Sequence, residues 1–126
     1  LVGSEMCIRD RCLTIQPTLA AHQGTTVTGS GVIFTDKEWY KLFERFYVWG
    51  HSFRPEAPFR LAIIHEGLGV PVFTRDLSMD ARGCFSVSSK LPYTGNYGIT
   101  VQSLDRLGGR PNNGFLCYVR VHVWIW

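Results

Sequence analysis

The chain has few of the features from which catalysis or metal binding is predicted. Its four cysteines form no C-x-x-C pair, which argues against a zinc ribbon and a thioredoxin-type redox motif. Its four histidines share no metal-ligand spacing, and both the G-x-S-x-G frame and the phosphate-binding glycine loop are missing. No apolar run approaches membrane-spanning length. We therefore expect no enzyme activity, no metal or cofactor, and no membrane span in these residues.

Strong charge of one sign is also lacking. The formal net charge is +3, and the basic residues are scattered rather than gathered into a run. Because nucleic-acid binding leaves a basic stripe or patch, we expect no nucleic-acid partner. Glu66, Asp76 and Asp80 offer a minor alternative, a Ca²⁺ site at one end of the fold. The simpler reading is that Asp80 opens a turn.

The composition that is present suits one globular domain. The chain has 126 residues, of which 45% are apolar and 13% aromatic. This is enough apolar surface for a core and argues against disorder. We expect a single domain over residues 12–126, as a fragment of a larger protein.

The stretch from Asp80 to Val101 indicates the fold class, because it reads as turn, strand, turn, strand. Apolar and polar residues alternate on both sides of Leu91-Pro92, which is the period of half-buried strands. Similar segments recur between Gly/Pro turns, and together they predict an all-β sandwich with strands at 45–50, 59–65, 70–77, 84–90, 96–104 and 115–125. The predicted core is Phe46, Val48, Leu61, Ile63, Phe85, Val87, Tyr97, Ile99, Val101, Val119 and Val121.

Residues 36–44 carry a helical pattern. Thr35 to Glu38 has the form of a capping box, and apolar residues follow at the spacing of one helical face. We predict a short helix over 36–44. The alternative is that this aromatic, β-prone run enters a strand.

The last predicted strand has two different faces. One is apolar: Phe115, Cys117, Val119, Val121, Val123 and Ile125. On the other, Tyr, Trp and Arg are residue types enriched where proteins bind partners, so we predict a binding surface of Tyr118, Arg120, His122, Trp124 and Trp126. The alternative is that these side chains cover a neighbouring element. Cys84 and Cys117 fall in different strands, so a disulfide is one option. Free, half-buried thiols are the simpler one, and we expect them.

Four short patterns, in order, resemble bacterial and archaeal immunoglobulin-like surface modules over residues 46–126. Val48 to Pro55 reads V-x-G-x-x-F-x-P, and Phe59 to Ile64 matches the apolar strand that follows. Asp80 to Val87 reads D-x-x-G-x-F-S-V, and Leu91 to Val101 reads L-P-x-x-G-x-Y-x-I-T-V. The resemblance implies an immunoglobulin-like antiparallel β-sandwich. Tyr97 is placed like the tyrosine-corner residue of such sandwiches, whose hydroxyl bonds a nearby backbone group.

The resemblance also implies a function class. Such modules carry no catalytic residues, so we expect a structural or adhesive module of a surface, secreted or virion protein. The expected partner is a protein or neighbouring domain that contacts the C-terminal strand. The alternative function is a carbohydrate-binding accessory domain of a larger extracellular enzyme. It requires an exposed aromatic platform from among Trp39, Tyr40, Trp49 and Trp124.

Residues 1–11 show neither a strand nor a helix period. The run from Glu5 to Asp10, E-M-C-I-R-D, resembles the conceptual translation of a transposase mosaic-end adapter used in sequencing libraries. We expect residues 1–11 to be an artefactual or disordered tail with few contacts to the domain.

Overall fold

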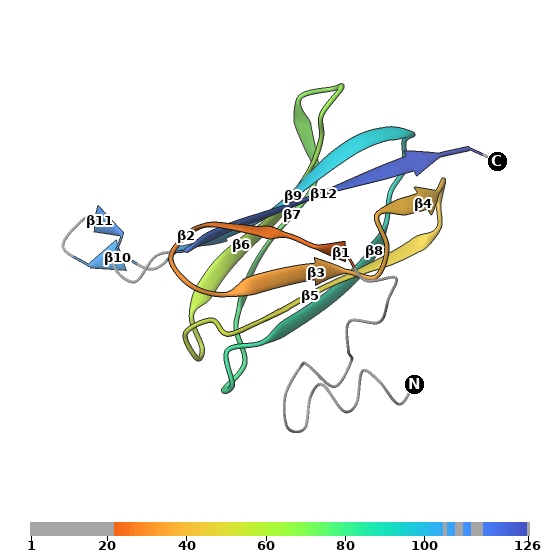
Figure 1. Cartoon of the computed structure of the whole chain (residues 1–126). Helices are drawn as coiled ribbons and strands as arrows, with labels where there is room; N and C mark the ends of the chain where they lie inside the picture. Colours follow the sequence, from red (N-terminus) through yellow and green to blue (C-terminus); the bar gives the residue numbers. More distant parts are fainter. Residues whose placement is uncertain (1–21, 105, 108–109, 112–114, 126) are drawn as a thin grey trace.

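The computed structural model describes residues 22–104, 106–107, 110–111 and 115–125, which form an all-β structure (Figure 1). The tail at 1–11 and Trp126 lie outside these residues. The strands are β1 (His22–Gln23), β2 (Thr25–Thr28), β3 (Val32–Thr35), β4 (Trp39–Lys41), β5 (Arg45–His51), β6 (Pro58–His65), β7 (Val70–Ser78), β8 (Phe85–Lys90), β9 (Gly95–Ser103), β10 (Arg106–Leu107), β11 (Arg110–Pro111) and β12 (Leu116–Trp124). Within the described ranges no helix is long and apolar enough to cross a membrane.

The described strands form two sheets that pack as a sandwich. The first, sheet A, has the order β1-β3-β5-β8. The second, sheet B, has the order β2-β12-β9-β6-β7, and β4 also pairs with β12. All these pairings are antiparallel except that of β4 with β12. A separate small hairpin joins β10 and β11.

The predicted strands are confirmed, each to within one residue at either end. The predicted core is confirmed as well, since every residue named for it is buried. Alternation explains this result, because a strand with one apolar face can bury that face only against the facing sheet. Ile125 is the exception on the last strand. It follows the end of β12 and is 64% exposed, so its placement on the core face was wrong.

The helix predicted at 36–44 is wrong, and β4 occupies the middle of that segment. Past the part of β12 that pairs with β2, backbone groups of β12 bond to the 38–42 segment. The His122 N–H donates to Glu38 O at 2.9 Å, and Trp124 O accepts from the Leu42 N–H at 2.7 Å. Thr35 Oγ1 donates to Lys37 O at 2.7 Å instead of capping a helix. Pairing with a distant strand therefore overrides the local capping pattern.

The chain passes from sheet A to sheet B at Gly24, between β1 and β2. A Cβ there would lie 2.7 Å from Tyr118 O and 2.8 Å from Ile33 Cγ1, so only glycine fits the crossing. As a result β2 and β4 pair with successive parts of the same edge of β12. Between those parts, His22 Nε2 lies 2.9 Å from Arg120 O and donates to it.

The stretch from Asp80 to Val101 forms the turn and strands that its pattern predicts. Asp80 Oδ1 accepts hydrogen bonds from the backbone N–H groups of Arg82 and Cys84, at 2.8 and 2.9 Å. Tyr97 is fully buried, and its hydroxyl donates to Tyr93 O at 2.7 Å. The predicted bond from this hydroxyl to a nearby backbone group is thus confirmed.

Candidate functional site

The outward face of β12 carries the candidate site, and the register of the strand sets its membership. Val119, Val121 and Val123 point into the sandwich, whereas the residues between them point outward. The structure places four of the five predicted site residues on this outer face: Tyr118, Arg120, His122 and Trp124. The fifth, Trp126, lies outside the described residues.

Three rings from two strands form an aromatic cluster of Trp39, His122 and Trp124. The parallel register of β4 sets Trp39 opposite His122 and Lys41 opposite Trp124. The Trp39 ring stacks on His122 with centroids 4.3 Å apart, and its centroid lies 5.3 Å from that of Trp124 at a 38° tilt. Trp39 is 50% exposed and Trp124 43% exposed. Two large indoles are therefore held side by side and half open to solvent.

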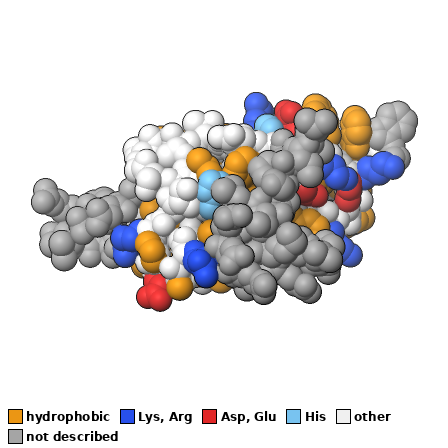
Figure 2. Space-filling model, turned by 60° about the horizontal axis from the view of Figure 1, so that its bottom comes forward, with side chains coloured by type: hydrophobic (Ala, Val, Ile, Leu, Met, Phe, Trp, Pro, Cys, Tyr) orange, Lys and Arg blue, Asp and Glu red, His pale blue; other side chains and the backbone are white. Residues whose placement is uncertain are grey.

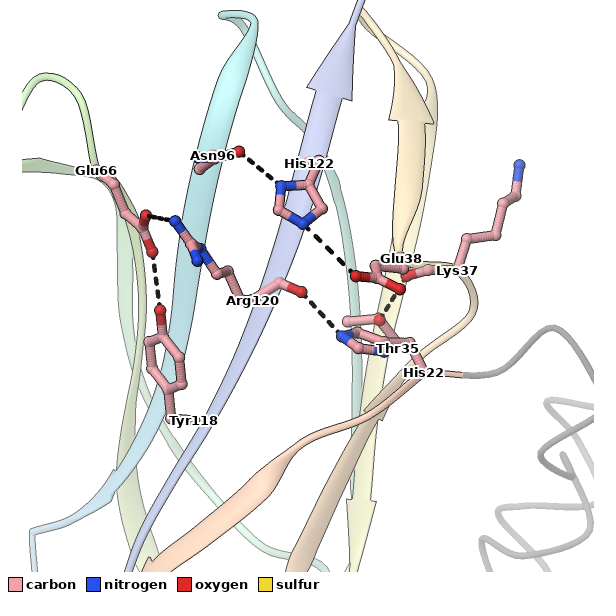
Figure 3. Close-up of polar contacts among 9 residues, drawn as sticks. All are labelled: His22, Thr35, Lys37, Glu38, Glu66, Asn96, Tyr118, Arg120 and His122. Carbon is pink, nitrogen blue, oxygen red and sulfur yellow. Dashed lines mark hydrogen bonds and ion pairs between the residues drawn. The ribbon is translucent and has the colours of Figure 1, made fainter.

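Polar side chains of the same face form two separate groups (Figure 3). One is a polar network of Glu66, Tyr118 and Arg120, and the other consists of Asn96 and Glu38, which both contact His122. Glu66 follows β6 and accepts from the Tyr118 hydroxyl and from Arg120, both at 2.8 Å. On the other side, His122 Nδ1 lies 2.6 Å from Asn96 Oδ1, and His122 Nε2 lies 3.6 Å from Glu38 Oε2. His122 thus belongs to the aromatic cluster and also contacts Asn96 and Glu38.

The network shifts the ionisation of its members. The hydrogen bond from Tyr118 and the contact with Arg120 hold the pKa of Glu66 below its usual value. The pKa of Tyr118 is raised by desolvation and by its bond to the Glu66 carboxylate. At neutral pH the pair is therefore a carboxylate that accepts from a neutral phenol.

Tyr118 reaches Glu66 because Gly98 of β9 carries no side chain. A Cβ at Gly98 would lie 2.7 Å from Tyr118 Cε1. The tyrosine ring therefore lies across β9 in the space that the glycine leaves. This contact connects β12 to the residue that follows β6 and fixes the ring in place.

Two members of the predicted aromatic platform are not on this surface. Tyr40 is buried because alternation along β4 turns it inward, and its hydroxyl donates to Asp36 Oδ1 at 2.5 Å. Trp49 is buried and stacks on Phe34, with centroids 5.7 Å apart. Of the four candidate residues, Trp39 and Trp124 are therefore the exposed ones, and burial excludes Tyr40 and Trp49.

Sequence reasoning missed the partners that the fold brings to β12. Glu38 was read as part of a capping box, and Glu66 as a minor Ca²⁺ ligand with Asp76 and Asp80. Glu66 and Asp80 lie beyond opposite ends of β6, and Asp76 pairs with Arg60 at 2.7 Å. Among the described residues no group of three or more His, Cys, Asp or Glu side chains is arranged to hold a metal ion.

Both described cysteines are free thiols, as expected, but both are buried rather than half-buried. Cys117 is fully buried on the inner face of β12, and burial raises the pKa of its thiol. Its sulfur lies 3.7 Å from Gly31 O. This thiol fills the core and contributes nothing to the outer surface.

The fold and this surface define a two-sheet β-sandwich in which the central strand β12 has an aromatic and polar outer face. No family model and no curated protein matches the chain. A similar solved structure is the PmoD soluble domain from Methylocystis sp., with a TM-score of 0.54 and 16% sequence identity. The match covers 79% of this chain and 96% of that one. At this identity the likeness concerns the fold alone.

Proposed function

We propose that this chain is a non-catalytic, adhesive immunoglobulin-like module of a surface, secreted or virion protein, and that it binds through the outer face of β12. The observation that carries the proposal is the half-exposed pair of Trp39 and Trp124 on that face. Leaving large aromatic side chains in water is unfavourable, and adjacent exposed ones often mark an interaction site. Binding a partner would bury the exposed surface of the two indoles.

The residue types on this face suit binding. Trp, Tyr and Arg dominate the energetics of protein interfaces, and Trp39, Tyr118, Arg120 and Trp124 supply all of them. Figure 2 brings the bottom of Figure 1 forward, which is the side of sheet A. On the outer face of sheet B, the half-exposed indoles of Trp39 and Trp124 lie among the charged side chains of Glu38, Glu66 and Arg120. A mixed surface of this kind is typical of reversible recognition.

Two observations support the immunoglobulin-like part of the proposal. Tyr97 makes the backbone bond of a tyrosine corner, to Tyr93. The first strands also divide between the two sheets, with β1 in sheet A and β2 in sheet B. Both features agree with the order of the four sequence patterns.

The polar groups of the face have structural partners, which favours recognition over chemistry. Glu66 is bonded to Tyr118 and Arg120, and His122 contacts Asn96. A general base requires a reacting group within hydrogen-bond reach, and these contacts occupy side chains that would otherwise serve.

The test is adhesion of the fluorescently labelled module to intact microbial cells and to extracellular matrix. We expect binding that falls about tenfold in Trp39→Ala and in Trp124→Ala, since one aromatic contact of this kind is worth up to about 1.4 kcal/mol. Tyr47→Ala is the matched control, because Tyr47 is a 46% exposed aromatic on sheet A. Adhesion that is equally weakened in Tyr47→Ala, or unchanged in both Trp variants, would refute the proposal.

A carbohydrate-binding accessory domain of a larger extracellular enzyme is the second candidate function. The same two indoles favour it, because flat exposed aromatic rings stack on sugars. The two candidates share one surface and differ in what the module is joined to. The reading frame around this chain distinguishes them: an adjoining catalytic domain favours the second, and repeated modules or a surface anchor favour the first.

A further inference from the structure

We propose that the aromatic cluster binds a neutral carbohydrate chain, with the apolar face of a sugar ring against the indoles of Trp39 and Trp124. This inference rests on the proposed function and gives its ligand a chemical class. Three properties of the surface carry it: the arrangement of the rings, the balance of charge around them, and the fixed polar groups beside them.

The rings lie on the outer face of sheet B, where the Trp39 ring stacks on His122 and lies tilted beside Trp124. His122, Trp39 and Trp124 follow one another with centroid separations of 4.3 and 5.3 Å. One face of a pyranose carries C–H groups with partial positive charge, which are attracted to the electron-rich face of an indole. Since Trp39 is 50% and Trp124 43% exposed, about half of each indole remains open to a sugar ring.

Positive and negative side chains around the aromatic cluster are equal in number, which favours a neutral ligand over a charged one. Glu38 and Glu66 are matched by Lys41, opposite Trp124 on β4, and by Arg120. Further along the sheet, Arg60 and Asp76 form another ion pair at 2.7 Å. An anionic polymer requires an excess of positive charge and a basic segment an excess of negative charge, and this face offers neither.

The polar groups beside the rings are held in place before any ligand arrives. Asn96 lies against His122, and Arg120 lies against Glu66. An asparagine amide has two N–H donors beyond its oxygen, and a guanidinium has five N–H donors, so both can serve sugar hydroxyls while keeping these contacts. Fixed groups lose little conformational entropy on binding, which favours recognition of a flexible glycan.

Affinity electrophoresis through gels that contain one soluble polysaccharide each tests the inference. The probes are the neutral polymers mannan, xylan, galactan and mixed-linkage β-glucan, with hyaluronan as the anionic comparison. We expect at least one neutral polymer to retard the wild-type protein. We also expect Trp39→Ala and Trp124→Ala to weaken that retardation about tenfold. Tyr47→Ala should migrate like the wild type.

Two additions keep the result decisive. Trp39→Tyr preserves a ring on β4 and should retain most of the retardation, so a loss in Trp39→Ala is not attributable to unfolding if the thermal midpoints agree. Because the ligand is uncharged, its affinity should change by less than about twofold between low and high salt. Retardation by hyaluronan that disappears in salt would contradict the inference.

The inference fails separately from the proposed function. Periodate cleaves vicinal diols of sugars, so treating the cells used for adhesion should abolish binding, whereas protease treatment should not. Adhesion through Trp39 and Trp124 that survives periodate and is lost after protease would leave the adhesive function standing and exclude a glycan ligand. If no neutral polymer retards the protein and it adheres to no surface, both the glycan inference and the adhesive function are refuted.

Discussion

Tyr97 shows how much one side chain contributes when its ring and its hydroxyl are both used. The ring is fully buried between the sheets and meets His65 edge-on, with centroids 4.9 Å apart. The hydroxyl accepts from the Tyr93 N–H at 2.9 Å and donates to the Tyr93 carbonyl at 2.7 Å. The residue therefore fills the core and also holds the turn that leads into β9.

We predict that Tyr97→Phe lowers the free energy of unfolding by about 1 kcal/mol, because the ring stays and only the hydrogen bonds are lost. Tyr97→Ala should cost about 3–5 kcal/mol, since it also leaves a cavity. Urea denaturation of the two variants measures both values. Equal losses would show that the hydroxyl, rather than the ring, accounts for the whole contribution.

Glu66 gives the outer face a defined pH dependence. Its folded-state pKa lies below the ordinary value of 4.5, chiefly because the Tyr118 hydroxyl donates to it and also because of Arg120. A depressed carboxyl pKa stabilises the fold above the unfolded pKa, and that contribution is lost as the pH falls from about 4.5 through the folded value. The effect is less than about 1 kcal/mol because the pair is partly exposed.

We therefore expect the stability difference between wild type and Glu66→Gln to shrink on acidification below pH 4.5. Thermal unfolding of both proteins from pH 7 to pH 3 measures it. A difference that stays constant over this range would show that Glu66 titrates as a free carboxyl.

At the scale of the element, β12 combines two roles on its two faces. Its inner valines are buried between the sheets, while its outer residues form the candidate site. It is central rather than an edge strand, because β9 pairs along one side and β2 and β4 share the other. Substitutions on its two faces should therefore have different consequences.

We predict that Val121→Asp unfolds the domain, because an unpaired charge in the core costs several kcal/mol. Trp124→Lys should leave the fold intact, with a loss of about 1 kcal/mol from the contact with Trp39, and should weaken binding or self-association. Circular dichroism and light scattering of the purified variants report on the two effects. If Trp124→Lys changes stability alone in an otherwise monomeric protein, the outer face is ordinary packing.

The sequence predicts the elements that depend on local alternation and misses the one that depends on a distant strand. The inward and outward faces of β8, with Phe85 and Val87, and of β12 can be predicted because apolar and polar residues alternate within each strand. Trp39 to Lys41 form a strand because they pair with the part of the β12 edge that β2 does not reach. The sequence of residues 35–44 contains no sign of this distant pairing. The capping pattern therefore predicted the wrong element.

The candidate site divides in the same way. Its four described β12 members follow from the outward face of one strand. Trp39, Asn96 and Glu66 join them from β4, from β9 and from the residue after β6, and only the sheet order brings these elements together. The role of Gly98 could not be predicted from the sequence either, because it depends on the Tyr118 ring that lies against this glycine.

At the scale of the whole molecule, the two sheets use their outer faces differently. On sheet A the rings of Phe34 and Trp49 stack on each other and are buried, leaving Tyr47 exposed beside them. On sheet B the aromatic cluster remains half exposed, with charged residues around it. This asymmetry is what makes the outer face of β12 the binding surface in our account.

Nuclear magnetic resonance of the indole N–H signals tests this claim most directly. The labelled protein is titrated with oligosaccharides released from the neutral polysaccharide that retards it most. We predict that the signals of Trp39 and Trp124 shift together in a saturable manner while that of the buried Trp49 stays in place. Shifts confined to Trp49, or to residues of sheet A, with Trp39 and Trp124 unchanged, would contradict the account.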